Sequence, residues 1–175
     1  MKPSGRRSGS MAKPVLRKSP SVAIIVEEPR WHTAMPGLRV PLRRAVKLAL
    51  KGAGAVAQGS LTILLTDDAA LKRLNADFRG KDKPTNVLSF PAAANPENHL
   101  GDIAIAYGVT AGEAREAKKR FSDHATHLAV HGVLHLLGYD HETAAEANVM
   151  ESLEVAVLSE LGIADPYAAR VMEVA

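Results

Sequence analysis

Short apolar runs alternate along the chain with longer segments that mix apolar and charged residues. The runs are rich in Val, Ile and Leu and have the length of buried strands. Four strands are therefore predicted, at residues 21–26, 60–65, 86–90 and 100–106. Residues 31–41 contain Pro36, Gly37 and Pro41 and are predicted to be a connector without regular structure.

In the longer segments the apolar positions follow the period of amphipathic helices. Three helices are predicted at residues 42–50, 110–120 and 142–161. Another is predicted to start at the capping residues 66–68 and to continue through residues 75–78. The fifth is predicted to start at the capping residues 122–123 and to end at residue 137. Four short strands and about five helices predict an α/β (α+β) fold, in which a small four-stranded mixed sheet packs against the helices.

Charge is distributed unevenly along the chain. Residues 1–20 contain six Lys or Arg, no acid and few apolar residues, so they are predicted to form a disordered basic extension. Residues 21–175 are predicted to form a single domain, because their number falls within the usual size of one. Residues 131–175 contain one Arg against eight acids, so any attraction to polyanions is expected from the front of the chain.

Composition excludes several classes of protein. The chain has no Cys, which rules out disulfides and thiolate metal ligands and is consistent with a reducing compartment. No run approaches the length of a membrane span, so no membrane partner is expected. The basic start also lacks the apolar segment of a secretory signal.

The stretch HGVLHLLGYDH, residues 131–141, contains three histidines at metal-ligand spacing. His131 and His135 are four residues apart, so on a helix both imidazoles project from the same face. Gly138 is placed to end the helix in a left-handed conformation, and the turn after it can carry His141 back toward the other two. Three convergent imidazoles would hold one Zn²⁺, or another divalent transition metal, and leave one position open, as catalytic sites do.

Metzincin proteases share this histidine spacing, but their second position is a Glu that acts as the general base. Gly132 occupies that position here. Loss of a positioned base typically lowers the rate by about 10²- to 10⁴-fold. A metzincin-like metalloprotease without its Glu base is therefore the less favoured interpretation.

The histidine stretch, with FRGKDKPTNVLSFP (residues 78–91) and LGDIAIA (residues 100–106), resembles the YbeY family of rRNA-maturation endoribonucleases. The similarity extends from about residue 61 to residue 167, and no signature position departs from the pattern. The resemblance implies a single-strand-specific, metal-dependent endoribonuclease of the cytoplasm. Its partners would be single-stranded rRNA and the small ribosomal subunit or 70S ribosome, and its role 16S rRNA 3′ end maturation and ribosome quality control. The three histidines would hold the zinc.

The resemblance also implies that Arg79 is a functionally important arginine of the substrate cleft. This role is consistent with the chemistry of the reaction, because phosphodiester cleavage builds negative charge on the scissile phosphate, and a metal and a guanidinium can stabilise that charge from opposite sides. We therefore expect Arg79, in a Gly- and Lys-containing loop that enters a strand, to clamp the phosphate. Lys81 and Lys83 would attract the RNA backbone, and the alternative is a solvated charged loop.

A non-catalytic ribosome assembly factor with a structural metal remains the second alternative. A structural zinc normally has four protein ligands, and Asp140 is the one candidate for a fourth near His141. Asp102 and Asp140 are also candidate partners of an imidazole N–H or proton carriers. Because aromatic residues make up only 4% of the chain, extended base stacking is not expected.

Overall fold

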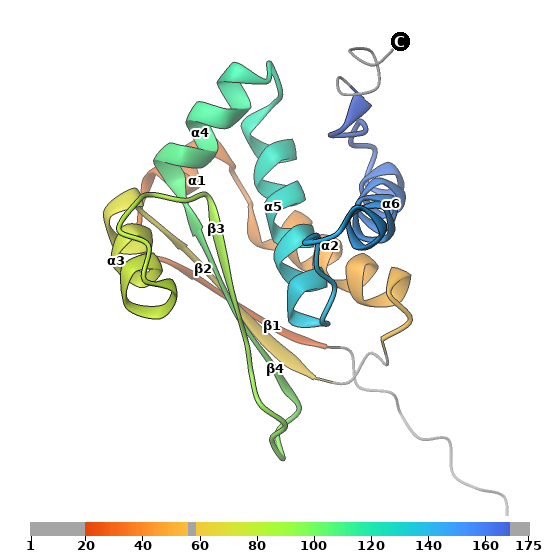
Figure 1. Cartoon of the computed structure of the whole chain (residues 1–175). Coiled ribbons are helices and arrows are strands. Elements are labelled where there is room, and N and C mark those ends of the chain that lie inside the picture. The colour runs from red at the N-terminus through yellow and green to blue at the C-terminus, as the bar shows by residue number, and fades with distance from the viewer. Residues whose placement is uncertain (1–19, 56–58, 169–175) are drawn as a thin grey trace, which may run out of the picture.

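A four-stranded mixed sheet forms the centre of the computed structural model, which describes residues 20–55 and 59–168 (Figure 1). Three strands are parallel: β1 (Ser21–Val26), β2 (Ser60–Thr66) and β4 (His99–Ala106). Strand β3 (Val87–Pro91) pairs antiparallel with β4 and completes the order β1-β2-β4-β3. The predicted strands and the mixed sheet are confirmed. The predicted disordered extension, residues 1–20, lies outside the described residues except for Pro20.

Within the described residues six helices accompany the sheet, one more than predicted. They are α1 (Arg30–Ala34), α2 (Arg39–Gly52), α3 (Asp68–Arg79), α4 (Tyr107–Glu116), α5 (Phe121–Leu136) and α6 (Ala144–Glu160). None of them, within the part of the chain that is described, is both long and apolar enough to cross a membrane.

The predicted connector at residues 31–41 was wrong, because it contains α1 and the first turn of α2. Pro41 is the third residue of α2, where a helix tolerates proline since the missing N–H would have no partner in the helix. Helix α1 is held by Trp31, whose buried indole Nε1 donates a hydrogen bond to the Thr66 carbonyl at 3.1 Å. The hydrogen bond between Trp31 and Thr66 therefore stabilises a helix in a segment whose sequence predicts a loop.

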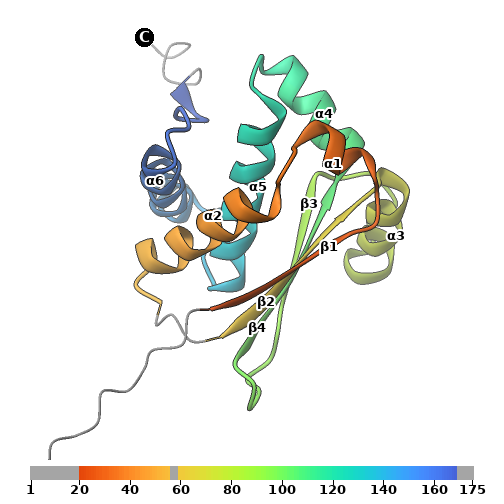
Figure 2. The same cartoon turned by 180° about the vertical axis from the view of Figure 1, so that it is seen from behind.

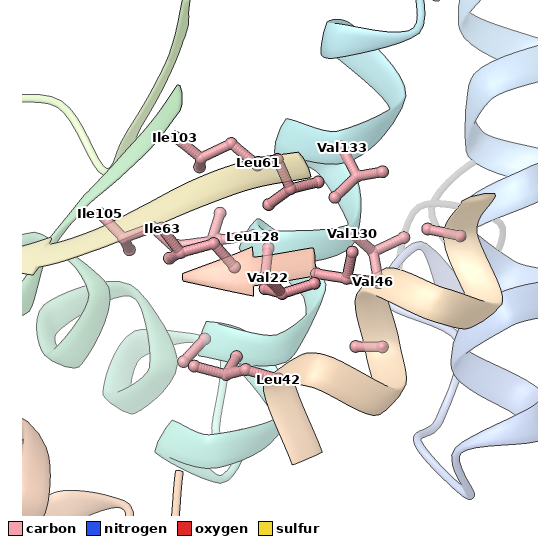
Figure 3. Close-up of a cluster of buried hydrophobic side chains, with 14 of the residues drawn as sticks. Val22, Leu42, Val46, Leu61, Ile63, Ile103, Ile105, Leu128, Val130 and Val133 are labelled. Atoms are coloured by element: carbon pink, nitrogen blue, oxygen red, sulfur yellow. The ribbon is translucent and has the colours of Figure 1, made fainter. Parts of the chain in front are cut away.

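The main core lies between one face of the sheet and helices α2, α5 and α6 (Figure 3). Alternate residues of the strands, such as Val22, Ile63 and Ile103, point into this core and pack against α2 and α5. Helix α3 lies on the other side of the sheet, as Figures 1 and 2 show. There a smaller cluster forms around Leu71 and Leu88. The sheet therefore has a fully covered inner face and a partly covered outer face.

Helix α5 approaches the inner face of the sheet very closely at Gly132. A Cβ atom added to this glycine would lie 2.8 Å from Cγ2 of Ile103 in β4. Ile103 is fully buried, so its branched side chain has little room to move. The glycine thus sets the distance between the sheet and the helix that carries His131 and His135.

We expect Gly132→Ala to lower the free energy of unfolding by about 1–2 kcal/mol, because overpacking the core outweighs the gain in helix propensity. Chemical denaturation measures the change. Gly112→Ala is the matched control, since Gly112 lies in helix α4 with nothing within 4 Å of the added Cβ. That variant is expected to be neutral or stabilised by up to about 1 kcal/mol. Equal stability changes in the two variants would refute the close approach.

Candidate metal centre

The first two histidines of the motif lie on the same face of α5. His131 and His135 are one turn apart, and their Nε2 atoms approach to 3.0 Å. The helix then ends in a Schellman arrangement: the Gly138 N–H bonds to the His135 carbonyl and the Tyr139 N–H to the Leu134 carbonyl. Gly138 has a φ of 88°, as this ending requires. The predicted helix end is therefore confirmed.

The turn after Gly138 returns His141 to the other two histidines. Its ring centroid lies 5.4 Å from that of His131 and 5.0 Å from that of His135. One ligand nitrogen from each of the three residues lies within 4.8 Å of the other two. Three imidazoles thus meet in space, although one of them comes from outside the helix.

Hydrogen bonds at the opposite ring nitrogens fix which nitrogens are free to bind a metal. His135 Nδ1 lies 3.0 Å from the Tyr139 carbonyl, which can only accept, so Nδ1 carries the proton. His131 Nδ1 lies 2.7 Å from a carboxylate oxygen of Glu154 and donates to it. The Nε2 atoms of the two rings therefore face each other, on the side of each ring away from these partners.

At 3.0 Å the two Nε2 atoms need a proton or a metal cation between them, because two facing lone pairs would repel. In a tetrahedral zinc site, nitrogens bonded at roughly 2.0–2.1 Å lie about 3.3 Å from each other, close to the separation here. Burial and the neighbouring His131 and His141 also lower the pKa of His135, which keeps this imidazole in the neutral form that binds metal. The donor set therefore fits a single divalent transition-metal ion.

A buried carboxylate that the sequence analysis missed supports this arrangement. Glu154 of α6 is fully buried and accepts hydrogen bonds from His131 Nδ1 at 2.7 Å and from His127 Nε2 at 2.8 Å. The Tyr167 hydroxyl also donates to it. Burial raises the pKa of Glu154, but the hydrogen bonds from the two histidines and Tyr167 outweigh it and lower the pKa to about 2. The carboxylate is ionised and orients the His131 ring.

Glu154 could have been found from its position in the helix. Met150, Glu154, Val157 and Leu158 are the buried residues of α6 and follow helical spacing. An acid on such a stripe needs a buried partner. Val149, the apolar residue next to Met150 in the chain, lies outside this buried stripe and is 54% exposed.

The acidic residues that the sequence singled out lie elsewhere. Asp140 accepts a hydrogen bond from the backbone N–H of His141 at 2.8 Å, as a turn residue does. Asp102 pairs with His99 at 3.1 Å on the partly covered outer face of the sheet. Within the described part of the chain, no carboxylate joins the three imidazoles in a ligand group.

A hollow of about 340 Å³ adjoins the histidine cluster. It lies between α5, α6 and the segment after α6. His131 and His141 line one wall, and Glu151, Glu154 and Tyr167 line the other. A water molecule can therefore reach His131 and His141 from this side.

Arg79 is the last residue of α3, not part of a loop as predicted, because Gly80 ends the helix with a φ of 65°. Its Nη2 lies 3.4 Å from the Ser89 carbonyl on the edge strand β3. The Ser89 hydroxyl in turn donates to the Gly132 carbonyl at 3.2 Å. Two successive contacts therefore connect Arg79 to the residue that follows His131.

The position that holds the general base in metzincins is structurally closed to a side chain. Gly132 faces Ile103 so closely that even a methyl group would collide with it. A Glu side chain is therefore excluded at this position, because the backbone of α5 packs directly on the sheet there. The metalloprotease alternative is not favoured.

The family model for endoribonuclease YbeY matches residues 31–162. A relative named endoribonuclease YbeY from Nitrobacter winogradskyi is 47% identical over 175 residues, which cover 93% of this chain and 90% of that protein. The relative of the same name from Chelativorans sp. is 52% identical over 136 residues, 75% of this chain and 83% of that protein. The solution structure of a Thermotoga maritima protein, 27% identical, superposes with a TM-score of 0.52 over 80% of this chain and 91% of that chain. The predicted resemblance is confirmed: the chain belongs to the endoribonuclease YbeY family.

Proposed function

We propose that this protein is a single-strand-specific, metal-dependent endoribonuclease that acts in 16S rRNA 3′ end maturation and ribosome quality control. Family membership supports the reaction class. The observation that carries the proposal is the convergence of the Nε2 atoms of His131 and His135 with a ring nitrogen of His141. Single-stranded rRNA, the small ribosomal subunit or 70S ribosome, and a cytoplasmic location belong to the same proposal.

His131, His135 and His141 would hold one ion, with Zn²⁺ as the favoured metal. Such an ion supplies Lewis-acid polarisation of a phosphoryl oxygen and lowers the pKa of water. Glu154 and the Tyr139 carbonyl hold the Nδ1 protons of His131 and His135, so both rings keep their Nε2 atoms directed toward the ion. An ionised Glu154 also makes the Nε2 atom of His131 a stronger metal ligand.

Arg79 would bind the scissile phosphate from the edge of the sheet. Its side chain ends in a planar fork whose N–H groups match two phosphate oxygens. The single 3.4 Å contact with the Ser89 carbonyl is long, which leaves most of the guanidinium donors available to a ligand. Arg79 would stabilise the charge that builds on the phosphate as the P–O bond is attacked.

A non-catalytic assembly factor with a structural metal is less favoured. A structural zinc is closed by four protein ligands. The described residues offer three imidazoles beside an accessible hollow, and Asp140 is engaged in its own turn. An open ligand position supports a catalytic ion.

We expect His135→Ala to abolish stoichiometric metal binding, because two imidazoles leave the ion with half of a tetrahedral ligand set. Elemental analysis of protein purified without chelators measures this, with about one ion per chain expected in the unmodified protein. His32→Ala is the control, since His32 lies on α1 outside the ligand group. A full metal complement in the His135 variant would contradict the site.

We expect Glu154→Gln to weaken metal affinity by about 10- to 100-fold, because the neutral amide no longer polarises His131. Competition with a chromogenic chelator measures the affinity. Glu160→Gln on the same helix is the matched control, since the Glu160 side chain is 58% exposed and lies far along α6 from the histidines. An affinity equal to that of the control would remove Glu154 from the metal centre.

We expect Arg79→Ala to reduce kcat for cleavage of single-stranded rRNA by about 10²- to 10³-fold while metal content stays unchanged. Arg79→Lys should restore only part of the rate, because an ammonium lacks the fork. Arg73→Ala, at an exposed position of the same helix, controls for loss of general positive charge. Contaminating ribonucleases would respond to none of these variants, and undiminished cleavage by the Arg79→Ala protein would exclude Arg79 from the reaction.

A further inference from the structure

We propose that Phe78 and Phe90 form a base-stacking subsite, which holds a nucleobase of the RNA strand next to the scissile phosphate. The inference rests on the proposed endoribonuclease function and adds to it a place where the substrate's base is bound. The two rings come from α3 and β3 and lie with their centroids 5.2 Å apart at an interplanar angle of 68°.

Phe78 is exposed in a way that packing does not explain. Its side chain is 68% exposed, although it lies in the last turn of a helix whose other face packs on the sheet. Four large apolar residues of the described chain are exposed, and Phe78 is the aromatic one among them. An exposed ring beside a second, half-buried ring is typical of a surface that stacks on a ligand.

The pair borders an apolar hollow of about 340 Å³ on the outer face of the sheet. The hollow is formed by Leu64, Leu74, Phe78, Phe90, Asp102, Ile103 and Ala104. Such a space admits one planar aromatic ring system with part of its sugar. Its floor is apolar, so it offers the kind of contact that the face of a nucleobase makes.

Chain connectivity places this hollow next to Arg79. Phe78 immediately precedes Arg79, and Phe90 immediately follows Ser89, whose carbonyl lies 3.4 Å from Arg79 Nη2. Side chains alternate across a strand, so Ser89 points toward α5 while Phe90 points to the outer face. An RNA strand whose phosphate is bound by Arg79 at the edge of the sheet therefore has its adjoining base above the rings of Phe78 and Phe90.

The chemistry of the hollow selects a base and not a phosphate. Asp102 contributes a carboxylate that is 59% exposed, and this charge repels phosphate but accepts hydrogen bonds from the amino groups of bases. Positive charge lies next to the hollow on Arg79, which follows Phe78 directly and contacts the Ser89 carbonyl, where it suits the RNA backbone. A mostly apolar hollow with one hydrogen-bond acceptor, next to an arginine, matches a nucleobase and its phosphate in a single-stranded nucleic acid.

The test uses metal-loaded full-length protein and a series of single-stranded rRNA oligonucleotides in which 2-aminopurine replaces one base at a time. Stacking on an aromatic ring quenches 2-aminopurine fluorescence, which rapid mixing records before cleavage. Steady-state assays give KM and kcat for the same oligonucleotides. The variants are Phe78→Ala, Phe78→Leu and Phe78→Tyr, with Val40→Ala as the control for an exposed apolar residue, since Val40 is 75% exposed on α2.

We expect quenching at one position next to the cut site in the unmodified protein. Phe78→Ala should raise KM by roughly 5- to 150-fold, the loss expected for one stacked base, with little change in kcat. Phe78→Leu should lose the quenching although it keeps an apolar side chain, and Phe78→Tyr should retain both properties. Thermal unfolding and metal content confirm that each variant folds, as the exposure of Phe78 leads us to expect.

Unchanged KM and quenching in the Phe78→Ala protein would overturn the subsite while leaving the proposed function intact. The same result combined with weaker binding to the small ribosomal subunit would assign the rings to a protein contact and would equally overturn it. Phe78-dependent quenching without any RNA cleavage would overturn the proposed function and leave the subsite standing.

Discussion

The close contact between α5 and the sheet at Gly132 is the constraint on which the site depends. With no side chain at this position, the helix backbone lies against Ile103 of β4. The same contact brings the Gly132 carbonyl within 3.2 Å of the Ser89 hydroxyl on the edge strand. The close packing therefore fixes the histidine face of α5 relative to β3, the strand whose Ser89 carbonyl is contacted by Arg79.

Glu154 places a charge where the fold can least easily solvate it, and this has a structural consequence. A buried carboxylate is tolerated only with strong partners, so α6 must dock with Glu154 facing His127 and His131. The hydrogen bonds that dock α6 therefore also orient the ring of His131. The capping box formed by Thr143 and Glu146 begins the helix at the residue that this docking requires.

Much of the fold and part of the site could be predicted from local patterns. The branched apolar runs correspond to all four strands, and the spacing of His131, His135, Gly138 and His141 predicts the convergence that the structure contains. Helix α1 could not be predicted, because it is stabilised by the distant contact of Trp31 with Thr66. Glu154 is a different case, because its spacing from Met150, Val157 and Leu158 places it on the buried stripe of α6, whereas its partners His127 and His131 lie on another helix and are known only from the fold.

The proposed base-stacking subsite needs only two aromatic rings, so it is compatible with the low aromatic content of the chain. The chain contains only three Phe. Two of them, Phe78 and Phe90, nevertheless come together because a helix end and an edge strand meet beside Arg79. Composition describes averages over the chain, whereas a binding surface needs only a few residues in one place.

The three imidazoles proposed as metal ligands also determine how the centre would respond to oxidative stress. Thiolate ligands are converted by peroxide to sulfenic and sulfinic acids and then release their metal. Imidazoles do not follow this course, and the chain contains no cysteine at all. The sulfur of Met150, on the wall of the adjoining hollow, belongs to a residue that is 1% exposed. The histidine cluster therefore keeps its ligand atoms under peroxide concentrations that would dismantle a cysteine-based site.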